Sequence, residues 1–196
     1  MIQYHFPTAI LSEFHPILAN TMLPVARKYL ADARIAEIKW GYRTTYGYRH
    51  PGGIADMPDV KPFKDAVELI GRKYLRDIGY NDKELVFDTF VFASEMRDGS
   101  SHDEHTHPGA ILSGLLYLQV PKDSAPLIIT DPRPFRKFIS LPKLKDTQTN
   151  IAEVLITPKT GLLVMWESWL PHLVPKSRNT DEGRITMVFN IARKLA

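Results

Sequence analysis

A change in character after Asn81 constrains the fold of this chain more than any other feature of its sequence. From there on, short apolar segments alternate with turns rich in proline, glycine, aspartate and lysine. The segments are residues 85–96, 110–120, 127–130, 153–157, 162–166 and 184–192. Short strands at this spacing are typical of an antiparallel sandwich or jelly-roll barrel. We therefore predict a mainly β fold with some α-helix, in which a jelly-roll core spans residues 83–196.

The pattern of the first 82 residues predicts a helical layer packed on that core. Apolar residues recur at helical spacing in Ile17–Ala33, where Pro24 is expected to bend the helix, and more clearly in Asp59–Tyr80. Between them, Ile35–Tyr48 is rich in aromatic and β-branched residues and is compatible with a strand. We expect two N-terminal helices packed on the β core, within a single domain of residues 1–196. Segment 131–150, which contains prolines and lysines, predicts a long surface insertion.

The composition excludes several classes of protein. The 196 residues include no cysteine, so disulfides, cysteine-ligated zinc and thiol catalysis are excluded. The net charge of +3 comes from scattered basic residues, and no run of like charges indicates binding to nucleic acid or to a membrane. No apolar stretch is long enough for a membrane span or a signal peptide, so we expect a cytoplasmic location. The oligomeric state stays open, and a homodimer is compatible with the sequence.

Three of the seven histidines lie in one stretch, Ser101–Leu118, which runs into an apolar segment. His105 and His107 are separated by one residue, so in an extended chain both imidazoles point to the same side. A third histidine, His172, lies in a distant strand-like segment. Two close ligands on one strand and one on another strand are typical of a catalytic metal site with open coordination positions. We therefore predict that His105, His107 and His172 bind a metal ion.

Other interpretations of these histidines are open. The polar run ahead of His105 contains His102 and Glu104, which form a His-x-Glu pair of their own, so Glu104 could complete the metal shell in place of His107. The histidines of this stretch could also be exposed residues of a charged loop. His172 alone could be a hydrogen-bonded residue at the edge of a sandwich.

The last apolar segment separates polar from apolar side chains by alternation. One face carries Arg184, Thr186 and Asn190, and the other carries Ile185, Met187, Phe189 and Ile191. In one arrangement Arg184 lies in water on an outer strand. In the other, the polar face turns into the sandwich, where the guanidinium can clamp a planar carboxylate.

Three blocks of the sequence together resemble one protein family. They are HTHPGAILSGLLYL from His105, GLLVMWESWLPH from Gly161 and GRITMVFNIA from Gly183. In this order they are similar to a family of iron(II)- and 2-oxoglutarate-dependent oxygenases found in phages and marine bacteria. The pattern of that family reads His-x-His-Pro, Leu-Ser-Gly-x-Tyr-Tyr-Leu, Gly-x-Leu-x-x-Phe-Pro-x-x-x-x-His and Arg-x-Ser-x-x-x-Asn. The resemblance covers the C-terminal half, and the three blocks together are more specific than any one alone.

The resemblance implies a double-stranded β-helix, a cupin-like jelly-roll with the metal between its sheets. It implies iron(II) as the metal of the histidine site and Arg184 as the residue that holds the distal carboxylate of 2-oxoglutarate. Ser113, Tyr117 and Asn190 match positions of the motif, and each either reaches the cosubstrate or serves packing.

The sequence departs from the wider superfamily at one ligand position. The second ligand there is an aspartate or glutamate, whereas this chain has His107. Trp166-Glu167 replaces Phe-Pro, and Leu116 replaces the first tyrosine of the motif. These last two changes are conservative in size and leave the expected fold unaffected.

The resemblance implies an enzyme that hydroxylates a substrate with dioxygen and 2-oxoglutarate and releases succinate and CO2. A three-histidine site is also compatible with a zinc-dependent hydrolase or hydratase, and a jelly-roll can be a non-catalytic binding module. The substrate, a small molecule or a peptide, does not follow from the sequence. Four residues near the Gly52-Gly53 turn are expected to wall one side of the cavity: Arg43, Tyr46, Tyr48 and Arg49.

Overall fold

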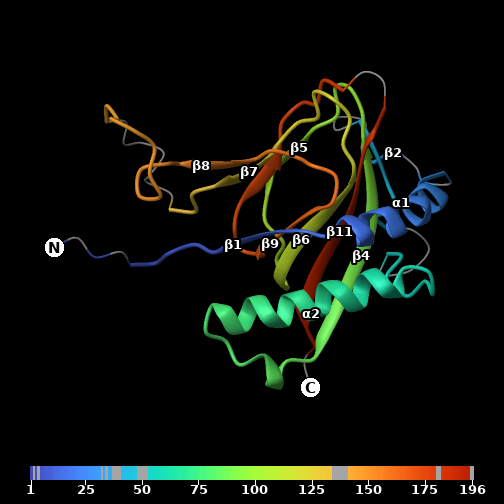
Figure 1. Cartoon of the computed structure of the whole chain (residues 1–196), viewed down its shortest axis with the longest axis horizontal. Helices are drawn as coiled ribbons and strands as arrows, with labels where there is room; N and C mark the ends of the chain where they lie inside the picture. Colours follow the sequence, from blue (N-terminus) through green and yellow to red (C-terminus); the bar gives the residue numbers. More distant parts are fainter. Residues whose placement is uncertain are drawn as a thin grey trace.

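The computed structural model describes residues 1, 3, 5–31, 33, 35–36, 41–47, 53–133, 141–179 and 182–194. In these ranges the chain forms a seven-stranded sheet, a four-stranded sheet and two α-helices (Figure 1). Every pair of neighbouring strands in either sheet is antiparallel. The mainly β character expected from the sequence is therefore confirmed.

The larger sheet has the strand order β1-β9-β6-β11-β4-β3-β2. The bounds of its strands are β1 Ile10–Phe14, β9 Leu162–Glu167, β6 Ala110–Gln119, β11 Arg184–Arg193, β4 Phe87–Met96, β3 Tyr42–Thr44 and β2 Ile35–Ala36. At its centre, β11 pairs with β4 along its whole length and with β6 along most of it. Two long neighbours hold the register of β11 and, with it, the side to which each of its side chains points.

The smaller sheet has the strand order β5-β10-β7-β8. Its strands are β5 His102–His105, β10 His172–Val174, β7 Leu127–Thr130 and β8 Glu153–Ile156. Buried residues of this sheet, Leu127 and Ile129, pack in one cluster with Leu115 and Val164 of the larger sheet. The two sheets therefore face each other across a shared apolar layer.

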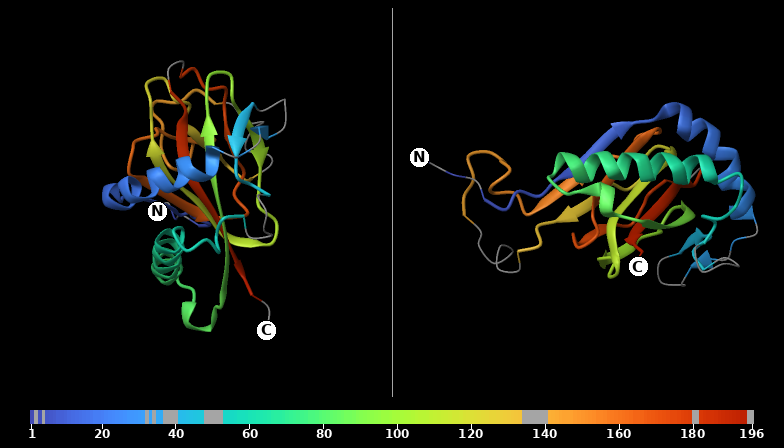
Figure 2. Two further views of the ribbon diagram at one scale, coloured as in Figure 1. Left: turned by 90° about the vertical axis from the view of Figure 1, so that its right-hand side faces the viewer. Right: turned by 90° about the horizontal axis from the view of Figure 1, so that it is seen from below.

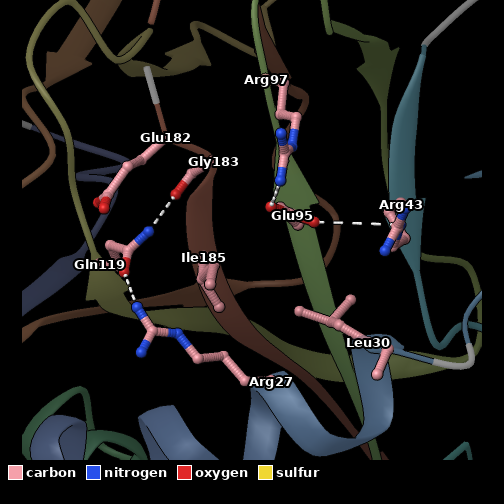
Figure 3. A pocket seen from close by; sticks show the side chains of 10 residues that line it. Arg27, Leu30, Arg43, Glu95, Arg97, Gln119, Glu182, Gly183 and Ile185 are labelled. Carbon is pink, nitrogen blue, oxygen red and sulfur yellow. Dashed lines mark hydrogen bonds and ion pairs between the residues drawn. The ribbon is translucent and has the colours of Figure 1, made fainter. Parts of the chain in front are cut away.

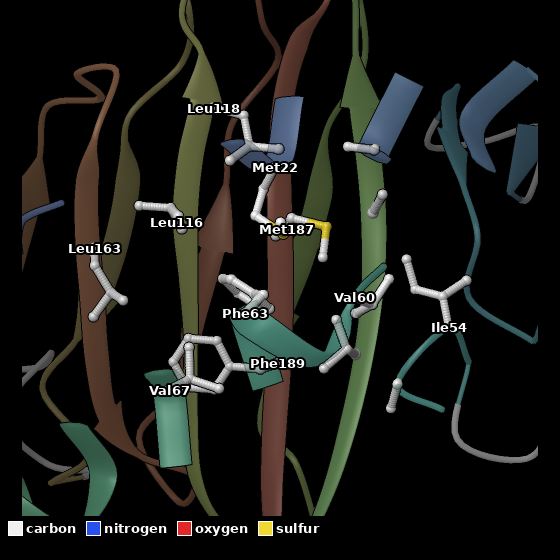
Figure 4. Close-up of a cluster of buried hydrophobic side chains, with 14 of the residues drawn as sticks. Met22, Ile54, Val60, Phe63, Val67, Leu116, Leu118, Leu163, Met187 and Phe189 are labelled. Carbon is white, nitrogen blue, oxygen red and sulfur yellow. The ribbon is translucent and has the colours of Figure 1, made fainter. Parts of the chain in front are cut away.

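Both helices lie on the opposite face of the larger sheet (Figure 2). They are α1, Pro16–Ala31, and α2, Lys61–Asp77. Figure 4 shows Met22 of α1 and Phe63 of α2 over strand residues such as Met187 and Phe189, and all four side chains are buried. The rings of Phe63 and Phe189 meet edge to face, with centroids 6.0 Å apart. Burial of this apolar face is the main force that holds the helices on the sheet.

The sequence signals for the ends of α2 agree with the structure. Pro62 lies in the first turn, where a proline is tolerated because its missing N–H would have no partner in the helix. The helix ends at Asp77, and Gly79 follows with a φ of +97°, a value that favours glycine. The other helix, α1, continues through Pro24. Within the described ranges, neither helix is both long and apolar enough to cross a membrane.

The N-terminal part of the chain contributes strands to the larger sheet in addition to the two helices. The segment before α1 contributes β1, which extends the larger sheet by pairing with β9. Part of the strand expected at Ile35–Tyr48 forms the short strands β2 and β3, and β3 pairs with β4. The strands β1, β2 and β3 thus complete the sheet that α1 and α2 cover.

The apolar segments of the C-terminal part form strands where the sequence predicted them. The strands β4, β6, β7, β8, β9 and β11 lie at the six expected places, with ends that differ by at most two residues. In the expected surface insertion, residues 131–133 and 141–150 contain no strand, and residues 134–140 lie outside the described residues. Local alternation and turn residues were sufficient to locate these strands.

Gly114 in β6 is required by close packing at the middle of the larger sheet. A Cβ atom at this position would overlap the ring of Phe189 and the carbonyl oxygen of Val164. We expect Gly114→Ala to lower the free energy of unfolding by about 1–3 kcal/mol, measured by urea denaturation. Gly71→Ala in α2 is the matched control, because its Cβ would meet only side-chain ends at 3.2 Å and alanine favours the helix. A smaller loss for Gly114→Ala than for Gly71→Ala would contradict this account.

Candidate metal centre and cavity

The pairing of β5 with β10 brings distant histidines together. His105 lies opposite His172, and the next pair is His102 with Val174, so β5 carries one extra residue between the two pairs. This β-bulge turns His102 toward the side of His105, with ring centroids 4.0 Å apart, whereas strict alternation would separate them. Residues 102–104, expected in a loop, thus belong to a strand.

His107 joins His105 and His172 in one group. The candidate ligand atoms of the three side chains all lie within 4.8 Å of one another, and Nε2 of His107 is 3.2 Å from Nε2 of His172. Two imidazole nitrogens that bind one metal at about 2.1 Å are about 3 Å apart when they are neighbours in its shell. The three histidines singled out in the sequence therefore lie together, and the His107–His172 distance matches that between two neighbouring ligands of one metal ion.

Backbone carbonyl groups select the tautomer of two of these histidines. Nδ1 of His105 lies 2.8 Å from the carbonyl oxygen of Asp103, and Nδ1 of His172 lies 3.0 Å from that of Leu170. A carbonyl oxygen only accepts, so each Nδ1 carries the proton and donates it. The lone pair is then on Nε2, and such hydrogen bonds are a common way to orient metal-binding imidazoles.

Burial keeps the three imidazoles neutral. Burial, with a smaller contribution from the neighbouring histidines, lowers the pKa of His172 to about 3 and the pKa of His107 to about 4. Burial also lowers the pKa of His105, although the hydrogen bond to Asp103 opposes this effect. At neutral pH each ring therefore offers the unprotonated nitrogen that a metal ion requires.

Glu104, the alternative ligand, is engaged elsewhere. Its Oε2 accepts a hydrogen bond of 2.7 Å from Oγ1 of Thr130, a buried residue at the end of β7. Glu104 is not part of the histidine group found in the described residues. The structure thus brings together the His-x-His pair and His172, and it directs Glu104 toward Thr130 of β7.

A cavity of about 940 Å³ opens beside the histidines and is lined by both sheets. The smaller sheet contributes the histidines and Leu127, while the larger one contributes the polar face of β11, including Arg184, Thr186 and Asn190. This volume lies in the upper range of small-molecule sites in proteins. Of the two arrangements open for Arg184, the structure has the one in which the polar face of β11 turns inward.

Arg184 is a buried cation at this cavity and is only 2% exposed. Within the described part of the chain, its Nη1 donates to the carbonyl oxygen of Ala125 at 2.6 Å, and its Nη2 lies 2.6 Å from Sδ of Met96. Its Nε has no hydrogen-bond partner there. Burial lowers the pKa of Arg184, but a guanidinium stays charged in proteins. Because none of the described carboxylates bonds to this buried cation, this part of the cavity is complementary to an anion.

Two more buried polar atoms near the cavity lack a partner among the described residues. They are the hydroxyl of Tyr117, whose ring lies 5.7 Å from Cζ of Arg184, and Nε1 of Trp166, whose ring lies 4.8 Å from that of His172. Burial raises the pKa of Tyr117, and Arg184 opposes this shift. Buried donors usually have hydrogen-bond partners in native proteins. A molecule bound in the cavity could therefore supply the partners that these two atoms lack.

Ser113 and Asn190 belong to a buried hydrogen-bond chain. The Ser113 hydroxyl donates to Oδ1 of Asn190 at 2.7 Å, and it lies 2.7 Å from the hydroxyl of Ser168, which must then be the donor. The backbone N–H of His107 donates to the carbonyl oxygen of Ser168. Ser168 was missed in the sequence, where it is one residue of a polar and aromatic turn. The chain of bonds links β11 and β6 to the segment that carries His107.

A second pocket, of about 310 Å³, lies by the end of α1 on the helix-covered side of the larger sheet (Figure 3). Several of its polar and charged side chains contact one another. Glu95 binds Arg97 at 2.8 Å and lies 4.0 Å from Arg43, while Gln119 accepts a hydrogen bond of 2.5 Å from Arg27. These contacts join β3, β4, β6 and α1, so the pocket has a structural role that is independent of the histidine site.

The residues expected to wall the substrate side of the cavity separate into three groups. Tyr46 lines the cavity. Arg43 lies at the second pocket instead, because alternation along β3 turns it away from the histidines. Tyr48 and Arg49 lie outside the described residues.

Comparison with known proteins gives one family match and several structural neighbours. Residues 91–190 match the model of the family described as "Putative 2OG-Fe(II) oxygenase". A prolyl-4-hydroxylase from Pseudomonas putida has a TM-score of 0.68 and 16% identity over 96% of this chain and 94% of its own. A comparison with curated protein sequences gave no match.

Other structural neighbours have different molecules bound. A Trichoplax adhaerens prolyl hydroxylase, in complex with a peptide fragment of the hypoxia inducible factor oxygen degradation domain, has a TM-score of 0.62 and 13% identity over 94% of this chain and 83% of its own. HygX from Streptomyces hygroscopicus, with nickel, 2-oxoglutarate and hygromycin B bound, has a TM-score of 0.56 and 13% identity over 96% and 84%. At such low identity, these neighbours show a shared fold.

The metal-free protein is expected to lose stability as the pH falls from about 6.5 to about 4. Unfolded histidines take up protons in this range, with a pKa near 6.5, whereas folded His172 and His107 stay neutral down to about 3 and about 4. The unfolded state then binds more protons, so the free energy of unfolding decreases with falling pH. Urea midpoints at pH 7 and pH 5, measured with a chelator present, test this. His172→Gln should reduce the difference between the two midpoints, and an unchanged difference would count against buried neutral histidines.

Proposed function

Because the chain belongs to the 2OG-Fe(II) oxygenase family, we propose that it hydroxylates a substrate with dioxygen and 2-oxoglutarate and releases succinate and CO2. The family match covers just over half of the chain and includes β6, β9, β10 and most of β11. Iron(II) and 2-oxoglutarate are the cofactors of this family. Bound together, they supply the oxidation of a substrate C–H bond by dioxygen.

In the proposed site, His105, His107 and His172 hold the iron through their Nε2 atoms. Support comes from their convergence within 4.8 Å and from the carbonyl groups that leave the lone pairs of His105 and His172 on Nε2. Three neutral ligands leave the metal one charge more positive than two histidines and a carboxylate would. This charge strengthens the attraction for an anionic cosubstrate, while the missing carboxylate weakens the retention of Fe(II).

The buried Arg184 guanidinium is the observation that carries the proposal for 2-oxoglutarate. Its described hydrogen bonds go to a carbonyl oxygen and a thioether, so the charge is not neutralised by a carboxylate there. The cavity has a metal site at the histidines and a buried cation at Arg184. A dicarboxylate fits such a cavity because each of its two ends would meet a positive charge. In this arrangement Arg184 binds the distal carboxylate, and the 2-oxo acid end lies at the histidines.

Tyr117, Ser113 and Asn190 complete the proposed cosubstrate site. The unpartnered hydroxyl of Tyr117 near Arg184 can donate to the same carboxylate. Asn190 lines the cavity and can contact the cosubstrate directly. The bonds of Ser113 to Asn190 and Ser168 favour an indirect contribution, in which Ser113 orients Asn190 and, through Ser168, the His107 segment.

We also propose that residues 1–196 form a single domain whose 83–196 part is a double-stranded β-helix. The two facing antiparallel sheets and the similarity to solved 2OG-Fe(II) oxygenases support this. The substrate cannot be taken from the neighbours, since one binds a peptide fragment and another hygromycin B. A three-histidine site also suits zinc, so metal analysis of the purified protein is a necessary check.

Removal of a proposed ligand should strongly weaken iron binding. We expect His172→Ala and His107→Ala each to weaken Fe(II) binding on the order of a hundredfold or more, since loss of even an outer partner costs about 10–100-fold. Anaerobic Fe(II) titration, followed by the absorption band that forms with 2-oxoglutarate, measures this. Glu104→Gln is the matched control and should bind Fe(II) like the wild type. The assignment fails if Glu104→Gln loses the metal and His107→Ala retains it, or if one equivalent of zinc is bound and no band forms.

Removal of the guanidinium should weaken cosubstrate binding without affecting the metal. We expect Arg184→Ala to raise the dissociation constant of 2-oxoglutarate at least about thirtyfold, because a buried charge pair loses one partner. Anaerobic calorimetric titration of the metal-loaded protein measures the constant, and elemental analysis checks that the metal content is unchanged. Arg27→Ala, in the second pocket, is the control and should have no effect. Equal affinity of Arg184→Ala and wild type would rule out the proposed clamp.

A further inference from the structure

One wall of the cavity is an aromatic surface that is partly open to solvent. Tyr46 follows β3, and Phe90 and Phe92 lie on β4; all three line the cavity. The Tyr46 ring lies 5.4 Å from each phenylalanine ring, and the two phenylalanine rings lie 5.7 Å apart. Tyr46 is 62% exposed, although exposed apolar surface costs about 25 cal/mol per Å². An exposed aromatic cluster that is retained inside a cavity indicates a binding surface.

The backbone beside Tyr46 is firmly held even though its ring is exposed. Thr45 exchanges two hydrogen bonds with Ala93 of β4: its N–H donates to the Ala93 carbonyl at 3.0 Å, and its hydroxyl accepts from the Ala93 N–H at 2.8 Å. The Thr44 hydroxyl donates to the same carbonyl and accepts from the N–H of Tyr46, both at 3.1 Å. Both threonines are buried. Two buried hydroxyls thus fix the backbone that carries the exposed Tyr46 ring. A fixed backbone loses less conformational entropy when a ligand packs on the ring.

A turn on the other side supports Phe90. Gly53 forms a bridge to Val91, and the N–H of Ile54 donates to the Val91 carbonyl at 2.9 Å. Gly53 has a φ of +69°, and a Cβ there would overlap the Val91 carbonyl and approach the Phe90 ring to 3.2 Å. The backbone at Gly53 therefore packs directly against this part of β4. The aromatic wall is a preformed surface, supported by segments on both sides.

The charges around the cavity restrict the ligand that this wall can take. Among the described lining residues there is no aspartate, glutamate or lysine, and the charged group is Arg184. A cationic substrate would find no carboxylate among the described lining residues, and the metal, Arg184 and bound 2-oxoglutarate together would leave a net positive charge that repels it. Aromatic cages that bind quaternary ammonium groups place the cation between ring faces. Here the three rings contact one another at 5.4–5.7 Å, which leaves no room for a cation among them.

We propose that Tyr46, Phe90 and Phe92 form an aromatic platform that seats an uncharged, apolar group of the substrate. An aliphatic ring or a branched aliphatic side chain that lies on these rings would present a C–H bond toward the histidine site. The platform thus selects the substrate class and positions the substrate, and the chemistry performed on it rests on the proposed function. The cavity is large enough for 2-oxoglutarate and such a group together.

The aromatic platform can be tested by measuring the binding of probe molecules under conditions in which no reaction occurs. The protein is loaded with Zn(II) and 2-oxoglutarate, and its affinities for four probes are measured by ligand-observed NMR titration: N-acetylprolinamide, N-acetylleucinamide, N-acetyllysinamide and choline. We expect the two apolar amides to bind at least about tenfold more tightly than the two cations. Tyr46→Ala and Phe92→Ala should each weaken the better apolar probe about fivefold or more, because each removes an aromatic contact. Tyr80→Ala, which changes an exposed tyrosine outside the cavity, is the matched control.

The outcomes separate this inference from the proposed function. Stronger binding of choline or the lysine amide, no binding of the apolar amides, or unchanged affinity in both Tyr46→Ala and Phe92→Ala would overturn the platform. Tyr46→Ala keeps the test decisive if Phe92→Ala fails to fold, because the Tyr46 ring is mostly exposed. Succinate formation by the Fe(II)-loaded wild type is measured separately. If no succinate forms while the apolar amides bind as expected, the oxygenase proposal fails and the platform stands.

Discussion

The pairing of β11 with β4 on one side and with β6 on the other is the interaction on which the rest of the structure depends. Alternation along β11 places Met187 and Phe189 under the helices and Arg184 and Asn190 in the cavity. A shift of the register by one residue would put the guanidinium into the apolar core and the apolar side chains into the cavity. The two long neighbours prevent such a shift, so one strand determines both the hydrophobic core and the polar end of the cavity.

Burial makes protonation of the clustered histidines unfavourable and at the same time leaves them ready to bind a metal ion. Removing imidazoles from water lowers their pKa values and keeps them neutral, and two backbone carbonyls select the tautomer with its lone pair on Nε2. The hydrogen-bond chain from Asn190 through Ser113 and Ser168 connects this cluster to the central strand. A disturbance of the β11 pairing would therefore reach the histidines as well as Arg184.

The residues that line the cavity differ from one part of it to another, so each part suits a different ligand group. The neutral histidines suit a metal ion and Arg184 attracts an anion, whereas the Tyr46, Phe90 and Phe92 wall offers ring surface and no charge. An anionic cosubstrate and an apolar substrate group can therefore occupy the same cavity without competing for the same contacts. The charged groups of the second pocket, by contrast, are largely paired with one another, which explains why that pocket has a structural role.

The sequence by itself determined the C-terminal strands, the two helices and the candidate ligands, because these features depend on local periodicity and on residue types. The alternation in β11 and the spacing of His105 and His107 can be read from neighbouring residues. Only the tertiary structure decided that β1 and β3 complete the larger sheet, that a bulge turns His102 toward His105, and that Glu104 bonds to Thr130 instead of joining the histidines. Each of these depends on which distant segments pair and in which register, and no local pattern encodes that pairing.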